Sequence, residues 1–308
     1  MALLPAETAL VGRAVAPLTR RAAREGESIE VAERRLRDLL GGRSSPPGPR
    51  MDRGKAALSV LQACGRRGDV MRAEAWFALL RRARAIPLAA HTVNAVILAC
   101  ARAADVPRAE GWLIQMLEKD IEPNVFTFNT VLAACSEAAD MPAAHRWFHR
   151  MEDVGITPDA VSYSTVITAC ARAGNHPLAE DWLARMRAAS IQPGVKCYSA
   201  VITACTAARD VHGAERWWRW MQEDGVTPDR AAYDTLIRAW SEEAGRSSGS
   251  SAATAVERAE AWLWKAREAG AEPSDVALLA LLAAFLRADD PEGAQRVVEA
   301  MRSLGRWP

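Results

Sequence analysis

The residues best suited to chemistry in this sequence are six cysteines and five histidines. No Cys-x-x-Cys pair occurs, and five cysteines recur at intervals of 36, 35, 35 and 35 residues: Cys64, Cys100, Cys135, Cys170 and Cys205. His145 and His149 have the i, i+4 spacing of two metal ligands on one helix face, but no glutamate follows His145 and no third ligand is evident. We therefore predict buried, reduced thiols and no metal site.

Signatures of catalysis are also missing from the sequence. It has no Gly-rich phosphate loop and no His-x-Glu motif followed by Pro-Cys-x-x-Cys, the zinc-deaminase signature. We predict a protein that is not an enzyme, holds no cofactor and takes no small-molecule substrate.

Charge and hydropathy limit the classes of partner. Lys and Arg number 39 against 38 Asp and Glu, so binding of a polyanion would depend on local placement of charge. No apolar run approaches 18 residues, and we expect no transmembrane helix and no membrane partner.

The cysteine interval belongs to an internal repeat. A tryptophan follows each of the five cysteines by twelve residues: Trp76, Trp112, Trp147, Trp182 and Trp217. Most units have a first apolar-striped segment, a turn ending in a favoured N-cap residue such as Asp105 or Asp140, and a second segment with the pattern Ala-Glu-x-Trp. This order predicts one helical hairpin per unit, and stacked hairpins form a solenoid.

The fold class predicted is all-α, a right-handed superhelical solenoid of about seven 35-residue helix-turn-helix repeats. The array covers residues 54–308, with repeats at 54–89, 90–124, 125–159, 160–194, 195–229, 230–274 and 275–308, and a Gly/Ser insertion at 246–253 in the sixth. Residues 1–50 are rich in Ala and Arg near their start and end in a Pro-rich linker. They are an organelle targeting segment, a degenerate helical hairpin, or both.

The run Asn124-Val125-Phe126-Thr127-Phe128-Asn129-Thr130-Val131-Leu132, together with the period of 35, resembles the pentatricopeptide repeat family. The resemblance covers residues 54–308 and implies binding of single-stranded RNA, one base per repeat. In that family the fifth and last residues of a repeat select the base. Carried over, Asn94 with Asn124 implies a pyrimidine, Asn129 with Asp159 uracil, Ser164 with Gly194 a purine, and Ser199 with Asp229 guanine, whereas Asp234 with Ser274 has no assigned base.

The resemblance also implies contacts beside the base. Leu58 and Leu279 hold the fifth position in the terminal repeats and imply no base reading. An apolar second residue wedges between bases: Phe126, Val161 and Val276 fit, while His91, Lys196 and Ala231 depart from the pattern at the same position. Phosphate contacts fall to Arg66, Arg102, Arg172 and Arg287, two residues past the cysteine position.

Simpler roles exist for the same residues. The recurring polar side chains also fit a solvated helix face, and the arginines also suit the negative end of a helix dipole. We predict sequence-preferring single-stranded RNA binding in organelle RNA processing, stability or translation, in a chloroplast or mitochondrion, with other RNA-processing proteins as further partners. The alternative is a tetratricopeptide-like scaffold whose groove holds a protein.

Overall fold

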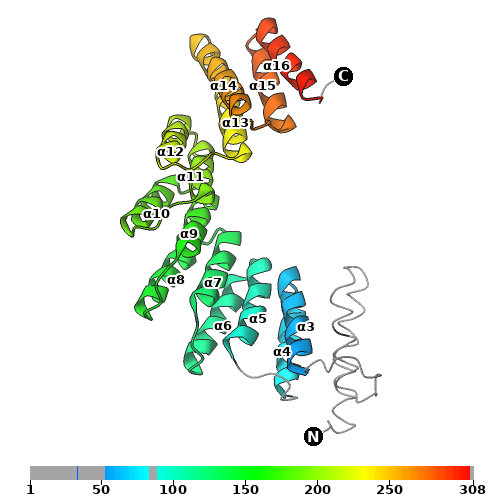
Figure 1. The fold of residues 1–308 in the computed structure, drawn as a ribbon, viewed down its shortest axis with the longest axis vertical. Coiled ribbons are helices and arrows are strands. Elements are labelled where there is room, and N and C mark those ends of the chain that lie inside the picture. Colours follow the sequence, from blue (N-terminus) through cyan, green and yellow to red (C-terminus); the bar gives the residue numbers. More distant parts are fainter. Residues whose placement is uncertain (1–32, 34–52, 83–88, 306–308) are drawn as a thin grey trace. The chain divides into compact units, whose positions relative to one another are not determined.

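The computed structural model describes Glu33, residues 53–82 and residues 89–305 (Figure 1). This described part contains fourteen helices and no strand. The prediction for residues 1–50 lies outside it except at Glu33, which is helical and fully buried. The predicted all-α class is confirmed for the described residues.

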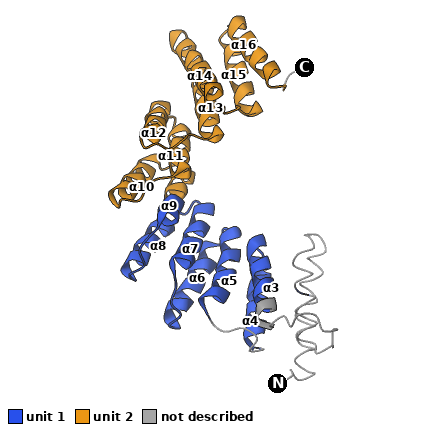
Figure 2. Ribbon diagram, in the orientation of Figure 1, with its two compact units in different colours: residues 1–165 blue, residues 166–308 orange. Residues whose placement is uncertain are grey.

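The chain divides into two compact units, residues 1–165 and 166–308 (Figure 2). The described helices of the first unit are α3 (Arg53–Arg67), α4 (Val70–Arg82), α5 (Ala90–Arg102), α6 (Val106–Glu118), α7 (Val125–Glu137) and α8 (Met141–Asp153). Helix α9 (Ala160–Arg172) runs across the division. Odd-numbered helices are the first helices of the hairpins, and within this unit α3 packs on α5 and α5 on α7.

The second unit continues the same pattern. Its helices are α10 (His176–Ala188), α11 (Val195–Ala207), α12 (Val211–Glu223), α13 (Arg230–Arg246), α14 (Ser250–Glu268), α15 (Asp275–Arg287) and α16 (Pro291–Ser303). Here α11 packs on α13 and α13 on α15. The Gly/Ser insertion does not form a long loop. It lengthens both helices of its hairpin, to 17 residues in α13 and 19 in α14, against 13 in most others.

One residue closes each first helix and opens the second. The amide of Asp105 donates to the carbonyl of Cys100 at 2.9 Å, while its carboxylate accepts from the amide of Arg108 at 3.2 Å. Ala104 between them is left-handed, with φ of 53°, which completes a Schellman-type helix end. The predicted N-caps all accept such an amide bond: Asp69, Asp105, Asp140, Asn175, Asp210 and Asp290.

A ladder of glutamate–tryptophan hydrogen bonds links the second helices. In four hairpins the glutamate of the Ala-Glu-x-Trp motif accepts the indole N–H of the next hairpin's tryptophan, as in Trp112 to Glu74 at 3.1 Å. In the third hairpin His145 replaces the glutamate, and Glu260 of the sixth accepts from Arg296 instead. The same bond joins Trp76 to Glu33, Trp147 to Glu110, and Trp217 to Glu180, at 2.9, 2.6 and 2.6 Å. Glu215 receives two indoles, Trp240 and Trp262, both at 2.9 Å. The motif therefore sets the register of the neighbouring hairpins that these bonds join.

The six cysteines are all free and buried. Burial, helped by nearby carboxylates such as Glu74 beside Cys100, raises the pKa of Cys64, Cys100, Cys135 and Cys205 to about 12. Cys197, at the third position of its repeat, is also buried and lies 3.8 Å from the sulfur of Met186. These thiols fill the core.

We predict that Glu215→Ala destabilises the fold strongly. The change leaves two buried indole N–H groups without an acceptor, and each such group costs about 1–3 kcal/mol, roughly 2–6 kcal/mol together. Urea titration of the variant should show an earlier unfolding midpoint. Glu223→Ala, on the exposed end of the same helix, is the control and should change little. Equal midpoints for the two variants would contradict a structural role for the ladder.

We predict that the cysteines of the native protein resist a thiol reagent at pH 8. Thiolate is the reactive form, and a pKa near 12 leaves almost none of it at that pH. In denaturant the pKa returns to its ordinary value and all six cysteines should label rapidly. The measurement is a time course of labelling by mass spectrometry, and fast stoichiometric labelling of the native chain would refute the prediction.

Candidate nucleic-acid interface

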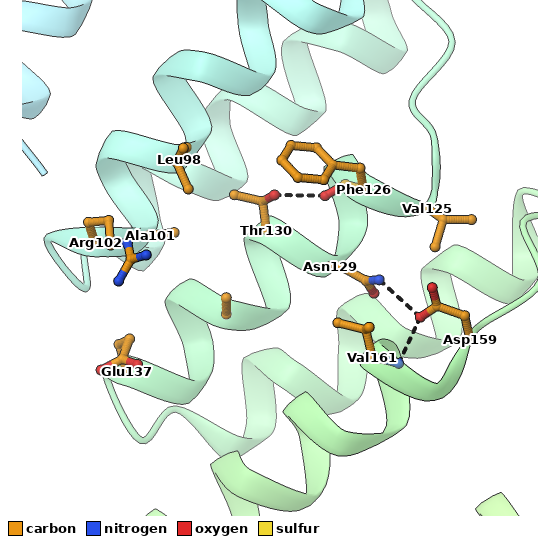
Figure 3. A pocket seen from close by; sticks show the side chains of 11 residues that line it. Leu98, Ala101, Arg102, Val125, Phe126, Asn129, Thr130, Glu137, Asp159 and Val161 are labelled. Atoms are coloured by element: carbon orange, nitrogen blue, oxygen red, sulfur yellow. Dashed lines mark hydrogen bonds between the residues drawn. The ribbon is translucent and has the colours of Figure 1, made fainter. Parts of the chain in front are cut away.

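An open cleft of about 640 Å³ lies on the first helices of the first unit (Figure 3). It is lined by Arg102 from α5, Phe126 and Asn129 from α7, and Asp159 and Val161 at the start of α9. We call it the third-repeat cleft because Asn129 and Asp159 are the fifth and last residues of repeat 125–159. Residues of three predicted kinds, base-reading, wedge and phosphate-binding, thus meet at one place.

Asn129 and Asp159 form a direct pair. The Asn129 Nδ2 donates to Asp159 Oδ1 at 3.0 Å, across the step between α7 and α9 (Figure 3). The same carboxylate oxygen accepts the amides of Val161 and Ser162, at 3.0 and 2.9 Å, and so caps α9. The position of Asp159 at the cap of α9 therefore places its carboxylate beside Asn129.

The Asp159 carboxyl stays ionised in this setting. Partial burial raises its pKa, but the hydrogen bonds from Ser162, Asn129 and Val161 outweigh that effect, and the net pKa lies below the usual value. The carboxylate is consequently an acceptor at neutral and mildly acidic pH. The hydrogen bonds from Asn129, Val161 and Ser162 all reach Oδ1, so Oδ2 has lone pairs left for a ligand.

In the second to the seventh repeat, the second residue is exposed. Phe126 and Val161 are 55% and 54% exposed, and both line the third-repeat cleft. Val276, 63% exposed, holds the same place in the last repeat, and His91, Lys196 and Ala231 are exposed there too. Exposed apolar side chains on either side of a polar pair suit a flat, aromatic ligand.

The fifth residues of the other repeats have different surroundings. Asn94 is 6% exposed, and its Oδ1 has no hydrogen-bond partner, while the Oγ of Ser199 is buried and likewise unpartnered. Ser164 instead donates to the carbonyl of Val161 at 3.0 Å. Leu58 is half-buried, and Leu279 is exposed. The five polar positions are therefore not equally prepared for a ligand.

The last residues of the repeats serve as N-caps of the following first helices. Asn124, Asp229 and Ser274 accept amide bonds from Thr127, Ala232 and Ala277, and Gly194 occupies the cap of α11 without a side chain. The sixth repeat brings its two residues together in another way, because Asp234 Oδ1 accepts from the amide of Ser274 at 2.9 Å. Asp234 also lies 3.6 Å from Arg230.

The four arginines predicted to contact phosphate lie in the last turns of their helices and are exposed: Arg66, Arg102, Arg172 and Arg287. Arg102 lines the third-repeat cleft. Arg287 donates to the carbonyl of Ser241 at 3.4 Å, which holds part of it against α13. Glu137 takes the equivalent position in the third repeat and lines the same cleft, a feature that the sequence analysis missed.

Ser162 is a second residue missed at the sequence level. Its hydroxyl lies 2.6 Å from Asn129 Oδ1 and is fully buried. The available signal was the third position of the repeats, which carries a hydroxyl in Thr92, Thr127 and Ser162.

Other kinds of site find little support in the described residues. No group of three or more His, Cys, Asp or Glu side chains within them could hold a metal ion. The rings of His145 and His149 lie 4.5 Å apart, and His149 is 2.9 Å from Glu152. No helix in this part of the chain combines the length and apolar character that a membrane crossing requires.

Solved structures share this fold. The pentatricopeptide repeat protein PPR10 from maize is 25% identical, with a TM-score of 0.66 over 98% of this chain and 44% of its own. PPR10 in complex with an 18-nt psaJ RNA element gives 16% identity and a TM-score of 0.53, over 94% and 47% of the two chains. The nuclear proteinaceous RNase P 2 (PRORP2) from A. thaliana is 17% identical, with a TM-score of 0.51 over 64% of this chain and 42% of its own. This likeness concerns the fold alone. The chain thus spans less than half the length of these proteins.

Comparison with curated protein sequences gives no match. The family model described as the pentacotripeptide-repeat region of PRORP matches residues 97–253, half of the chain. That match includes α7, α9 and the third-repeat cleft. Together with the repeated hairpins and the similarity to PPR10, it shows that this chain belongs to the pentatricopeptide repeat family.

Proposed function

We propose that the chain binds single-stranded RNA and that the third-repeat cleft holds one of its bases. The observation that carries the proposal is the meeting of Phe126, Val161 and the Asn129–Asp159 pair in one open cleft. Two exposed apolar side chains offer stacking surfaces for a base, and the polar pair faces its edge. Arg102 in the same cleft offers a charge for phosphate. The solved complex of PPR10 with an RNA element supports this assignment.

Uracil fits the polar pair best. Asn129 keeps one N–H after bonding Asp159, and the ionised Asp159 keeps Oδ2 as an acceptor. A donor beside an acceptor matches the O4 and N3–H of uracil. Cytosine presents a lone pair at N3, which the carboxylate repels. We therefore assign uracil to the third repeat.

The remaining repeats extend the preference over a short segment. We assign a pyrimidine to Asn94 with Asn124, a purine to Ser164 with Gly194, and guanine to Ser199 with Asp229. One neutral hydrogen bond to a base contributes about 0.5–1.5 kcal/mol, so four repeats give roughly 2–6 kcal/mol of discrimination. This is a preference for a short motif. A unique transcript site would need further contacts.

The proposed role is non-catalytic. The chain would protect, block or remodel a short transcript segment, or bring other RNA-processing proteins to it, in a chloroplast or mitochondrion. The organelle assignment is carried by the family and by the composition of residues 1–50, which lie outside the described residues. A protein-binding scaffold is the alternative, and the acid Glu137 inside the cleft is the observation in its favour.

A randomised single-stranded RNA pool tests the proposal. The protein should retain RNA enriched in a pyrimidine–uracil–purine–guanine core. Less RNA should be retained at the higher of two salt concentrations. Absent retention, or retention that salt does not change, would contradict RNA binding and favour the scaffold.

We predict that Asp159→Asn weakens the choice of uracil over cytosine. The neutral amide no longer repels cytosine N3, and a hydrogen bond to a charged group, worth about 1.5–3 kcal/mol, is lost with uracil. The ratio of the two affinities should fall about tenfold or more. Asparagine still caps the helix, as Asn124 does on α7, so the fold should persist. Asp153→Asn, on an exposed residue of α8, is the control. An unchanged uracil preference in Asp159→Asn would refute the pairing.

We predict that Arg102→Ala weakens binding to all RNA sequences alike. Loss of one phosphate contact should reduce the log–log salt slope by about 0.7, from a total near −3 if four arginines bind phosphate. Arg150→Ala, an exposed arginine on α8, serves as the matched control. The measurement is the affinity of each variant for RNA at several salt concentrations. Equal salt slopes for Arg102→Ala and Arg150→Ala would show that Arg102 makes no phosphate contact.

A further inference from the structure

We propose that Ser162 is a positioning residue that holds the Asn129 carboxamide in one orientation and thereby sharpens base selection by the third repeat. The inference rests on the proposed function. Ser162 itself is fully buried beneath the third-repeat cleft and has no path to a ligand. Any effect on RNA must therefore pass through the groups that it contacts.

The hydroxyl of Ser162 lies among three polar atoms. It is 2.6 Å from Asn129 Oδ1, 3.0 Å from Asp159 Oδ1, and 3.1 Å from the amide nitrogen of Asp159. That amide donates to the hydroxyl oxygen. Asp159 Oδ1 already accepts three N–H groups, from Asn129, Val161 and Ser162. The Ser162 hydroxyl therefore donates its single proton to Asn129 Oδ1, the nearest acceptor.

Two restraints then act on opposite ends of one carboxamide. Ser162 holds the oxygen, and Asp159 holds the nitrogen. A flipped carboxamide would set its oxygen against the carboxylate and its nitrogen against the hydroxyl proton. Because the ends of an amide differ only in donor and acceptor character, this orientation decides which edge atoms of a base are accepted.

The second repeat shows the same side chain without the restraint. Thr127 occupies the position equivalent to Ser162, but its hydroxyl bonds Asn124 Oδ1 at 3.0 Å. Asn94, equivalent to Asn129, is left with an unpartnered Oδ1. The chain therefore contains one held and one unheld reading asparagine, and we infer that the third repeat discriminates more sharply between pyrimidines.

The repeats themselves provide matched substitutions. Alanine and cysteine are both buried at the equivalent third position, in Ala232 and Cys197, so each fits such a site. Alanine removes the hydroxyl, and a thiol is only a weak donor. Thr92→Ala controls for capping, because the Thr92 hydroxyl also accepts a cap amide, that of Ala89, at 3.3 Å. The preceding repeat has Leu58 in place of an asparagine, so Thr92 has no reading asparagine to hold.

The experiment measures affinity for two RNAs that differ only in uracil or cytosine at the third-repeat base. That base is identified as the one whose preference changes in Asp159→Asn. Ser162→Ala and Ser162→Cys should each lower the uracil-to-cytosine affinity ratio about threefold to tenfold, the range of one neutral hydrogen bond. Thr92→Ala should keep the wild-type ratio.

The outcomes separate this inference from the proposed function. If wild type binds and Asp159→Asn shifts the ratio but Ser162→Ala and Ser162→Cys do not, the Ser162 inference is wrong and RNA binding stands. Equal losses in Ser162→Ala and Thr92→Ala would also overturn it, since capping would then explain both. If wild type retains no RNA, the proposed function itself fails.

Discussion

The hydrogen bond from a tryptophan to the glutamate of the preceding hairpin is the constraint on which most of the stacking depends. The exception is the step to Trp182, before which His145 stands in place of the glutamate. A single hairpin cannot bury its apolar faces, and stacking is what stabilises a repeat array. Tryptophan supplies a large apolar surface for stacking but also an N–H that needs an acceptor when buried. Glu110 and Glu215 provide it from the neighbouring second helix. A hairpin that slipped along its neighbour would bury both groups unpaired, so the ladder fixes register.

Register also places the polar residues of the first helices, including those at the step from the third to the fourth hairpin, where His145 replaces the glutamate of the ladder. Asp159 caps α9, and the same carboxylate meets Asn129 of the preceding helix only when adjacent hairpins are in step. The residues that cap helices well, namely Asn, Asp, Ser and Gly, also differ in donor and acceptor character. Under the proposed function, exchange of one capping residue for another would change the base that a repeat favours, while the stack of helices stays the same.

The sequence sufficed to predict the period, the helical hairpins, the N-caps and the all-α class, because each follows from spacing along one segment. It also pointed to Phe126 and Val161, which are exposed and share a cleft. It could not distinguish Asn94 from Asn129. Both are asparagines at the same position of their repeats, and they differ in the capping residue and the hydroxyl that the next repeat presents to them. Such contacts depend on side-chain rotamers across two hairpins, which no local pattern encodes.

The third-repeat cleft carries charges of both signs, and these bear on how it would select a ligand. Arg102 and Glu137 line the same space, and the whole chain has a formal net charge of +1. Long-range attraction of a polyanion is consequently weak, and a carboxylate near the ligand path penalises a badly placed phosphate. If the cleft holds a base as proposed, binding depends on short-range contacts, namely stacking on Phe126 and Val161 and hydrogen bonds to Asn129 and Asp159. These contacts differ between bases, whereas attraction to phosphate does not, so an acid in the cleft would lower affinity and raise the share of binding that depends on sequence.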